Sequence, residues 1–191
     1  HVLAADYARL PAEAIQAAKR RLIDSIACAA AAYPEPLCGR IREFAGRYQG
    51  TPSARIWGSG DATTLEMAAF ANGTMVRYLD HNDTYFGRAN GHPSDMIAGL
   101  VAVAQAFGAS GATLLAAIVA AYDVYCGLLA SVALAKRGID QATCAAIGTA
   151  AGASRLLGLD ENATGEALAL GLTPGMGLAD AISTVIRQTI R

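Results

Sequence analysis

Residues 112–135 read ATLLAAIVAAYDVYCGLLASVALA, a long apolar run with few polar side chains. The run is long enough to cross a bilayer. An ionised Asp123 near its middle would cost roughly 2.5 to 3.5 kcal/mol on membrane-insertion scales, and alanine offsets little of that cost. We therefore expect a buried core helix rather than a membrane span, and no membrane partner.

The composition around this run agrees with a compact all-α domain. Of the 191 residues 53% are hydrophobic, many of them alanine, whereas aromatic residues reach only 6%. Helices approach one another closely through such small side chains. The formal net charge of -1 gives no electrostatic reason to expect nucleic acid as a partner. The four cysteines form no C-x-x-C pair, which fits free thiols in a reducing cytoplasm.

Helix-start and helix-stop residues divide the chain into six or seven helices. Pro11 opens the first helix, which ends at residues 33–36, and the second is expected from Pro36 to about Tyr48. Residues 54–60 are expected to form a short extended connection rather than a sheet strand. Thr63 is expected to cap the next helix, and Glu66 to reach back to that cap. Later helix starts are predicted at Pro93, Ser110, Asp140 and Asp160.

Small residues mark the later part of the chain. Gly148, Gly152 and Ser154 are spaced so that a neighbouring backbone can approach their helix, which Gly158 is expected to end. We expect a break at residues 173–177. Because the chain starts at His1 without a methionine and ends at Arg191 without a stop signal, we expect it to be part of a longer protein.

One region concentrates reactive side chains. It reads YLDHNDTY at residues 78–85, followed by Arg88 and by NGHPSD at residues 90–95. This polar loop lies between the end of one apolar helix and the start of another, a position typical of a pocket mouth. The backbone amides of Ser94 and Asp95, at a helix start, are expected to be available to an anionic group.

Two other interpretations of this loop remain open from the residues alone. Asp80, Asn82 and Thr84 alternate like the start of a calcium loop, but the required glycine and terminal glutamate are absent, so we expect no metal. Alternatively, Asp80 and Asp83 only cap turns, and His92 is a histidine whose hydrogen bonds are satisfied at an interface.

The motif Tyr78-Leu79-Asp80-x-Asn82-Asp83-Thr84, with His92-Pro93-Ser94-Asp95 after it, resembles the signature of the MmgE/PrpD family. Three further segments resemble the family in the same order: RLIDSIA at 21–27, AAFANGT at 68–74 and GTAAGASRLLGL at 148–159. The residues Asn82-Asp83-Thr84 and Pro93-Ser94-Asp95 are most similar to the 2-methylcitrate dehydratase branch of the family. Other members are cis-aconitate decarboxylase and iminodisuccinate epimerase.

This resemblance implies an all-α domain over residues 1–191, without the α/β lid domain that later sequence forms in the family. It also implies a homodimer and lyase or isomerase chemistry without metal or organic cofactor. We expect a hydro-lyase acting on a small di- or tricarboxylate. The alternatives are a decarboxylase or epimerase of the same family, or a catalytically incomplete module for dimerisation or ligand binding.

The resemblance also places the site residues, because Asp80, Thr84 and His92 match the family's active-site positions. Dehydration of a β-hydroxy acid requires a base for a carbon-bound proton and an acid for the departing hydroxyl, and a histidine, whose unperturbed pKa is about 6.5, can serve as either. His92 is expected in that role, with Asp80 holding the imidazole or acting on the hydroxyl. The residues expected to bind substrate are Asn82, Asp83, Arg88, Ser94 and Gln141.

The chain also departs from the family pattern. Members usually carry a histidine in the loop after the long apolar helix, whereas residues 138–143 read GIDQAT here. Gln141 can form hydrogen bonds but cannot shuttle a proton. The family's basic residues that neutralise substrate carboxylates lie mostly beyond Arg191, so we expect this chain alone to have too few cations for a polyanionic substrate.

Overall fold

The computed structural model describes residues 2–172, apart from the side chains of Ala135 and Arg137. Within this range the all-α fold class is confirmed: seven α-helices are accompanied by 3-10 turns and two small hairpins. The helices are α1 (Ala12–Ala32), α2 (Pro36–Ala45), α3 (Leu65–Tyr78), α4 (Ile97–Ala106), α5 (Gly111–Ser131), α6 (Ala142–Leu157) and α7 (Glu161–Leu172). The strands are β1 (Ser53–Arg55), β2 (Ala62–Thr64), β3 (Tyr85–Phe86) and β4 (Asn90–Gly91). The break expected at residues 173–177 lies outside the described residues.

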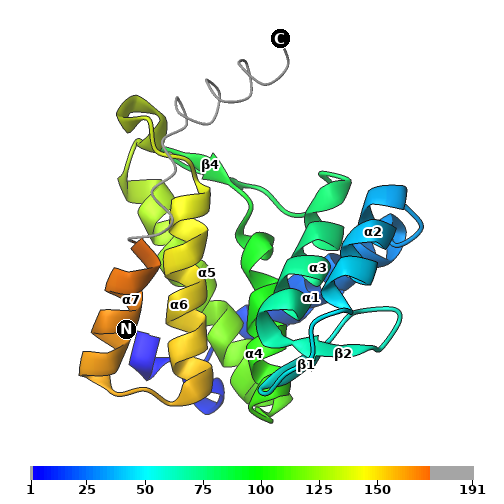
Figure 1. The fold of residues 1–191 in the computed structure, drawn as a ribbon. Helices are drawn as coiled ribbons and strands as arrows, with labels where there is room; N and C mark the ends of the chain where they lie inside the picture. Colours follow the sequence, from blue (N-terminus) through cyan, green and yellow to red (C-terminus); the bar gives the residue numbers. More distant parts are fainter. Residues whose placement is uncertain (1, 173–191) are drawn as a thin grey trace.

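The helices form two groups (Figure 1). α6 packs against both α5 and α7 in one group, while α3 packs against α1, α2 and α4 in the other. α1 and α4 also contact α5 and so join the groups. The polar loop between α3 and α4 carries β3 and β4, and Figure 1 shows β4 at the edge of the molecule where this loop crosses from one group to the other.

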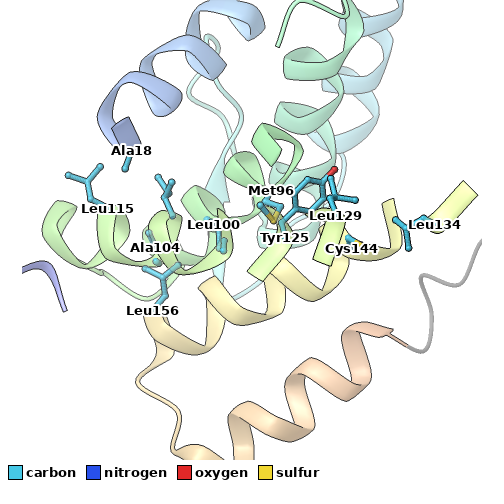
Figure 2. Packing of buried hydrophobic residues seen from close by; sticks show 13 residues of the cluster. Ala18, Met96, Leu100, Ala104, Leu115, Tyr125, Leu129, Leu134, Cys144 and Leu156 are labelled. Carbon is cyan, nitrogen blue, oxygen red and sulfur yellow. The ribbon is translucent and has the colours of Figure 1, made fainter. Parts of the chain in front are cut away.

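α5 is the central helix of the core. Ile118, Tyr125 and Leu129 on α5 are almost completely buried. Figure 2 shows Tyr125 beside Met96 and Leu129 in the main hydrophobic cluster. Within residues 2–172, α5 is the one helix long and apolar enough to span a membrane, a test that the core helix of a soluble protein also passes. Its burial against neighbouring helices agrees with the expected core helix.

The close approach of α5 and α6 depends on glycine. A Cβ atom on Gly152 would lie 2.9 Å from the Ala117 carbonyl oxygen, and one on Gly148 would lie 3.0 Å from the Ala121 carbonyl oxygen. The first distance is shorter than real Cβ contacts reach, and the second is at the limit of what they reach. The expected approach of a neighbouring backbone to this helix is therefore confirmed, and α5 is that neighbour.

Most predicted helix ends are confirmed. The Ser110 hydroxyl accepts a hydrogen bond from the Thr113 amide at 3.1 Å, and the Asp160 carboxylate accepts one from the Ala163 amide at 2.8 Å. Gly158 ends α6 with φ 64°, in the left-handed region. Three boundaries differ. α2 ends at Ala45 rather than near Tyr48, and Pro93 opens a 3-10 turn (Pro93–Met96) that leads into α4. The N-cap of α6 is Gln141 rather than Asp140, whose carboxylate accepts from the Ala142 amide at 2.8 Å.

Two predictions about residues 53–66 are wrong. Residues 54–60 are not a strandless connection, because β1 pairs antiparallel with β2 in a hairpin that places Ala54 opposite Thr63. The cap of α3 is Thr64, whose hydroxyl accepts from the Met67 amide at 3.4 Å. Thr63 is buried instead and donates its hydroxyl proton to the carbonyl oxygens of Ala45 and Tyr48. Strand alternation places Thr63 on the buried face and frees Thr64 for the helix.

Candidate functional site

The loop that carries the candidate site begins with a sharp change of chain direction after α3. Asp80 has φ 54°, the one non-glycine residue between residues 2 and 172 with a positive φ. Aspartate adopts this left-handed conformation more readily than most residues because its short polar side chain bonds locally. The Asp80 amide donates to the Arg77 carbonyl oxygen at 3.1 Å, in the turn that follows the last residue of α3.

The His92 imidazole is anchored through one ring nitrogen. Nδ1 lies 2.8 Å from the backbone carbonyl oxygen of Asp83, and the Thr84 hydroxyl oxygen lies 3.4 Å from the same nitrogen. Because a carbonyl oxygen can only accept, Nδ1 carries the proton in this bond. The neutral ring therefore keeps its lone pair on Nε2, which lies 4.0 Å from Asp80 Oδ1. The geometry gives His92 the tautomer of a proton acceptor at Nε2.

Asp80 is held as a carboxylate beside this imidazole. Arg77, one helical turn earlier, donates to Asp80 Oδ1, and this hydrogen bond together with the guanidinium charge lowers the pKa of Asp80. The side chain of Asp80 is 71% exposed. A carboxyl with a lowered pKa is a poor proton donor, which argues against the expected action of Asp80 as an acid on a hydroxyl, and its expected role beside the imidazole stays a prediction.

The Ser94 and Asp95 amides are not available to an external anion, so that prediction is wrong. The Ser94 amide donates to Asp83 Oδ1 at 2.9 Å, and the Asp95 amide donates to the His92 carbonyl oxygen at 3.1 Å. Asp83 Oδ2 accepts from the Tyr122 hydroxyl at 2.9 Å and lies 3.7 Å from Arg21 Nε. The Asp83 carboxylate thus occupies the Ser94 amide that was expected to bind an external anion. The expected contact of Asp83 with substrate stays a prediction.

A second buried network lies beneath the loop. Asn82 donates from its amide nitrogen to Ser94 Oγ and to Asp95 Oδ1, both at 3.0 Å, and its oxygen lies 3.4 Å from Arg77 Nη1. Burial raises the pKa of Asp95, while the charges of Arg77 and His92 oppose that shift. Because Asn82 and Ser94 already bond to each other and are buried, a substrate would have to replace an internal bond to reach either.

Gln141 reaches the same region from the start of α6. Its oxygen accepts a hydrogen bond from the hydroxyl of the fully buried Tyr125, and its side chain also hydrogen-bonds Asp95. Gly91 permits this arrangement, since a Cβ there would lie 2.9 Å from Gln141 Oε1. The structure thus brings Gln141, distant in sequence, to the polar loop, as its predicted site role requires.

Thr84 and Arg88 occupy the exposed rim of the loop. Among the described residues, no ion pair or hydrogen bond occupies the Arg88 guanidinium. His92, with a side chain 19% exposed, lines neither the cavity of about 430 Å³ beside Trp57 nor the one of about 270 Å³ between α1 and α5. No three histidine, cysteine, aspartate or glutamate side chains in residues 2–172 are grouped as a metal site would require.

Sequence comparison identifies the family. The model of the MmgE/PrpD N-terminal domain matches residues 1–187. The chain belongs to the MmgE/PrpD family. The anchored histidine and the loop around it are therefore features of an MmgE/PrpD N-terminal domain, and the resemblance found in the motif is confirmed.

Curated relatives of this MmgE/PrpD domain carry dehydratase names. It is 30% identical over 137 residues to a probable 2-methylcitrate dehydratase of Saccharomyces cerevisiae, covering 65% of this chain and 27% of the relative. It is 28% identical to the 2-methylcitrate dehydratase of Cupriavidus necator (86% and 36%) and 30% identical to an alkylcitrate dehydratase of a fungal species (78% and 33%). The matched region spans about a third of the length of these relatives.

Several side chains of the network were not predicted from the sequence. Arg77 contacts Asp80, Asn82 and Asp95, and the Asp95 carboxyl, of which only the backbone amide was predicted, is partly buried near His92. Arg21 and Tyr122 contact Asp83, and Tyr125 bonds Gln141. Helical spacing could have revealed Arg77, because it lies three residues before Asp80. Tyr122 gave no comparable signal, since in sequence it is one more side chain in an apolar helix.

Proposed function

We propose that this chain forms the substrate-facing helical part of a hydro-lyase that removes water from a small di- or tricarboxylate of the 2-methylcitrate type. The names of the relatives support the substrate class. The observation that carries the proposal is the anchored imidazole of His92, whose Nδ1 donates to the Asp83 carbonyl oxygen and whose Nε2 is left to accept a proton beside Asp80.

The chemistry follows from this tautomer. Nε2 removes the proton from a carbon next to a substrate carboxylate, and the electron pair of that C–H bond forms the new carbon–carbon double bond as the C–O bond of the hydroxyl breaks. The imidazolium that results is stabilised by the Asp80 carboxylate. It then returns the proton to the departing hydroxyl, which leaves as water.

The exposed rim supplies the substrate contacts. Arg88 offers a guanidinium for a substrate carboxylate, and the Thr84 hydroxyl offers a hydrogen bond close to His92. A tricarboxylate carries more negative charge than one arginine neutralises. We therefore propose that the remaining cations come from residues outside 2–172 or from a second copy, in the homodimer that the family implies.

Replacing His92 tests the proposal. Turnover of 2-methylcitrate and citrate is measured in the natural gene product that contains this chain, with His92→Gln compared to His81→Gln. His81 is the matched control because it is an exposed histidine of the same loop. We expect a loss of at least about 100-fold for His92→Gln, the range for a general acid–base group, and none for His81→Gln. Equal activity of both variants would overturn the role of His92.

A second candidate function is a ligand-binding or dimerisation module without catalysis. The observation that favours it is Gln141, which accepts from Tyr125 where the family usually carries a histidine. Thermal unfolding of the 191-residue chain with a series of citrate-like acids separates the two, since a ligand that binds only the folded state stabilises it as its concentration rises. Binding without turnover in the natural gene product would support the module.

The finer reaction type and the cellular setting are part of the proposal. Decarboxylation and epimerisation also begin with loss of a bond at carbon, so the position of His92 does not distinguish them from loss of water. Their products differ, and product analysis by NMR identifies the reaction. A cytoplasmic location is proposed from the four free thiols, three of which are buried.

A further inference from the structure

Asp83 connects the candidate site to the core through both its side chain and its backbone. The carboxylate, 5% exposed, contacts the Ser94 amide, the Tyr122 hydroxyl and Arg21, while the backbone carbonyl oxygen accepts from His92 Nδ1. These partners come from α1, α5 and the turn before α4. Asp83 is therefore held by three structural elements, and its carbonyl oxygen in turn holds the imidazole.

Tyr122 is fixed as a donor in this arrangement. Burial, together with the charge of Asp83, raises the pKa of Tyr122 well above its ordinary value, so the phenol keeps its proton. Its hydroxyl lies 2.9 Å from Asp83 Oδ2, and the side chain projects from the central core helix. Arg21 lies farther from the same oxygen, at 3.7 Å, and its side chain is half exposed, so Tyr122 is the stronger restraint.

We propose that Tyr122 is a positioning residue that acts through Asp83 to fix the ring orientation and the tautomer of His92. The inference rests on the proposed function for its catalytic consequence but not for its structural one. A hydrogen bond from Nδ1 to a carbonyl selects the tautomer only while that carbonyl stays within about 3 Å. Without the Tyr122 bond, residue 83 is held mainly by the Ser94 amide and can move away from the ring.

The test measures the tautomer directly. Nitrogen-15 NMR of the imidazole rings in the 191-residue chain distinguishes a protonated from an unprotonated Nδ1. We compare the wild type with Tyr122→Phe, with Asp83→Asn and with both together. Asp83→Asn keeps an oxygen for the Ser94 amide but replaces the carboxylate that faces Tyr122. The matched control is Thr63→Val, which removes a buried hydroxyl with two partners at the N-terminal end of α3, about 20 Å from the loop along this helix at 1.5 Å per residue.

We expect the wild type and Thr63→Val to show one neutral tautomer of His92, with Nδ1 protonated, and Tyr122→Phe and Asp83→Asn each to show a mixture. In the natural gene product, kcat falls about tenfold or more in both variants with KM little changed, as for other partners that orient a catalytic side chain. The double variant is no worse than Asp83→Asn alone, because both remove one interaction.

A single tautomer in folded Tyr122→Phe, identical to that of Thr63→Val, would overturn the proposal. If Tyr122→Phe does not fold, Asp83→Asn gives the same decision. A natural gene product without turnover on any tested acid would remove the proposed function, yet the NMR comparison would still decide whether Tyr122 positions His92.

Discussion

The side-chain amide of Asn82 donates to the carboxylate of Asp95 at 3.0 Å and so ties the polar loop to the turn before α4. Asp95 also lies 3.8 Å from Arg77 Nε and hydrogen-bonds Gln141. Burial of the ionised Asp95 carboxyl costs folding stability, and this carboxyl lies near the candidate catalytic histidine. Such combinations are common where function rather than stability selects the residues.

Asp95→Asn is expected to raise the melting temperature at pH 7. Burial raises the pKa of Asp95, so the folded state binds its proton more tightly than the unfolded state does. Stability from this group is therefore fully present below the ordinary aspartate pKa and is lost as pH rises through the raised value. Thermal unfolding between pH 3.5 and 7.5 should show the advantage of Asp95→Asn shrinking towards acid. An advantage that is constant with pH would contradict this assignment.

Asp80→Asn is expected to lower kcat by about 10- to 100-fold, the range for a residue that supports a catalytic partner. The amide keeps the shape and tolerates the left-handed backbone, but it cannot stabilise an imidazolium by charge. Steady-state kinetics of the natural gene product check this, with Asp61→Asn in the β1–β2 hairpin as an exposed control. Unchanged kcat in Asp80→Asn would show that Asp80 does not act on His92.

Arg77→Gln is expected to raise the pKa values of two carboxyls at once. The hydrogen bond and charge of Arg77 lower the pKa of Asp80, and the same charge opposes the raised pKa of Asp95. Carboxyl carbon NMR titrations of the 191-residue chain measure both groups. A lowered folded-state pKa contributes stability that is lost as pH falls through it. Without Arg77 the Asp80 carboxyl contributes less of this stability, so acidification below pH 4 should destabilise the variant less than the wild type. A shift at Asp95 alone would contradict the Arg77–Asp80 pair.

Two glycine substitutions are expected to change stability in opposite directions. Gly152→Ala should destabilise by about 1–3 kcal/mol, as overpacking does, because its Cβ would lie 2.6 Å from Leu100 Cδ2 and 2.9 Å from the Ala117 carbonyl oxygen. Gly127→Ala, in α5 with nothing within 4 Å of the new Cβ, should stabilise by about 0.5–1 kcal/mol. Urea unfolding measures both. A Gly152→Ala variant as stable as Gly127→Ala would show that α5 and α6 are not in close contact there.

Local signals were sufficient for most of the helices. Ser110, Asp160 and Gly158 mark helix ends through bonds and backbone angles that involve only neighbouring residues, so the sequence predicts them directly. The β1–β2 hairpin was missed because each strand has only three residues, too few to display alternation.

The candidate site divides in the same way. By itself the sequence determined the all-α fold, the family and the polar loop with His92 and Asp80, because these depend on residue types at short spacing. Only the tertiary structure decided which groups meet. Tyr122 lies 39 residues after its partner Asp83 and reaches it from α5. Gln141, just before α6, bonds Tyr125 of α5 and Asp95 at the end of the loop. The physical reason is that a buried carboxylate takes whichever donor the packing of α5 presents, and no local pattern records that choice.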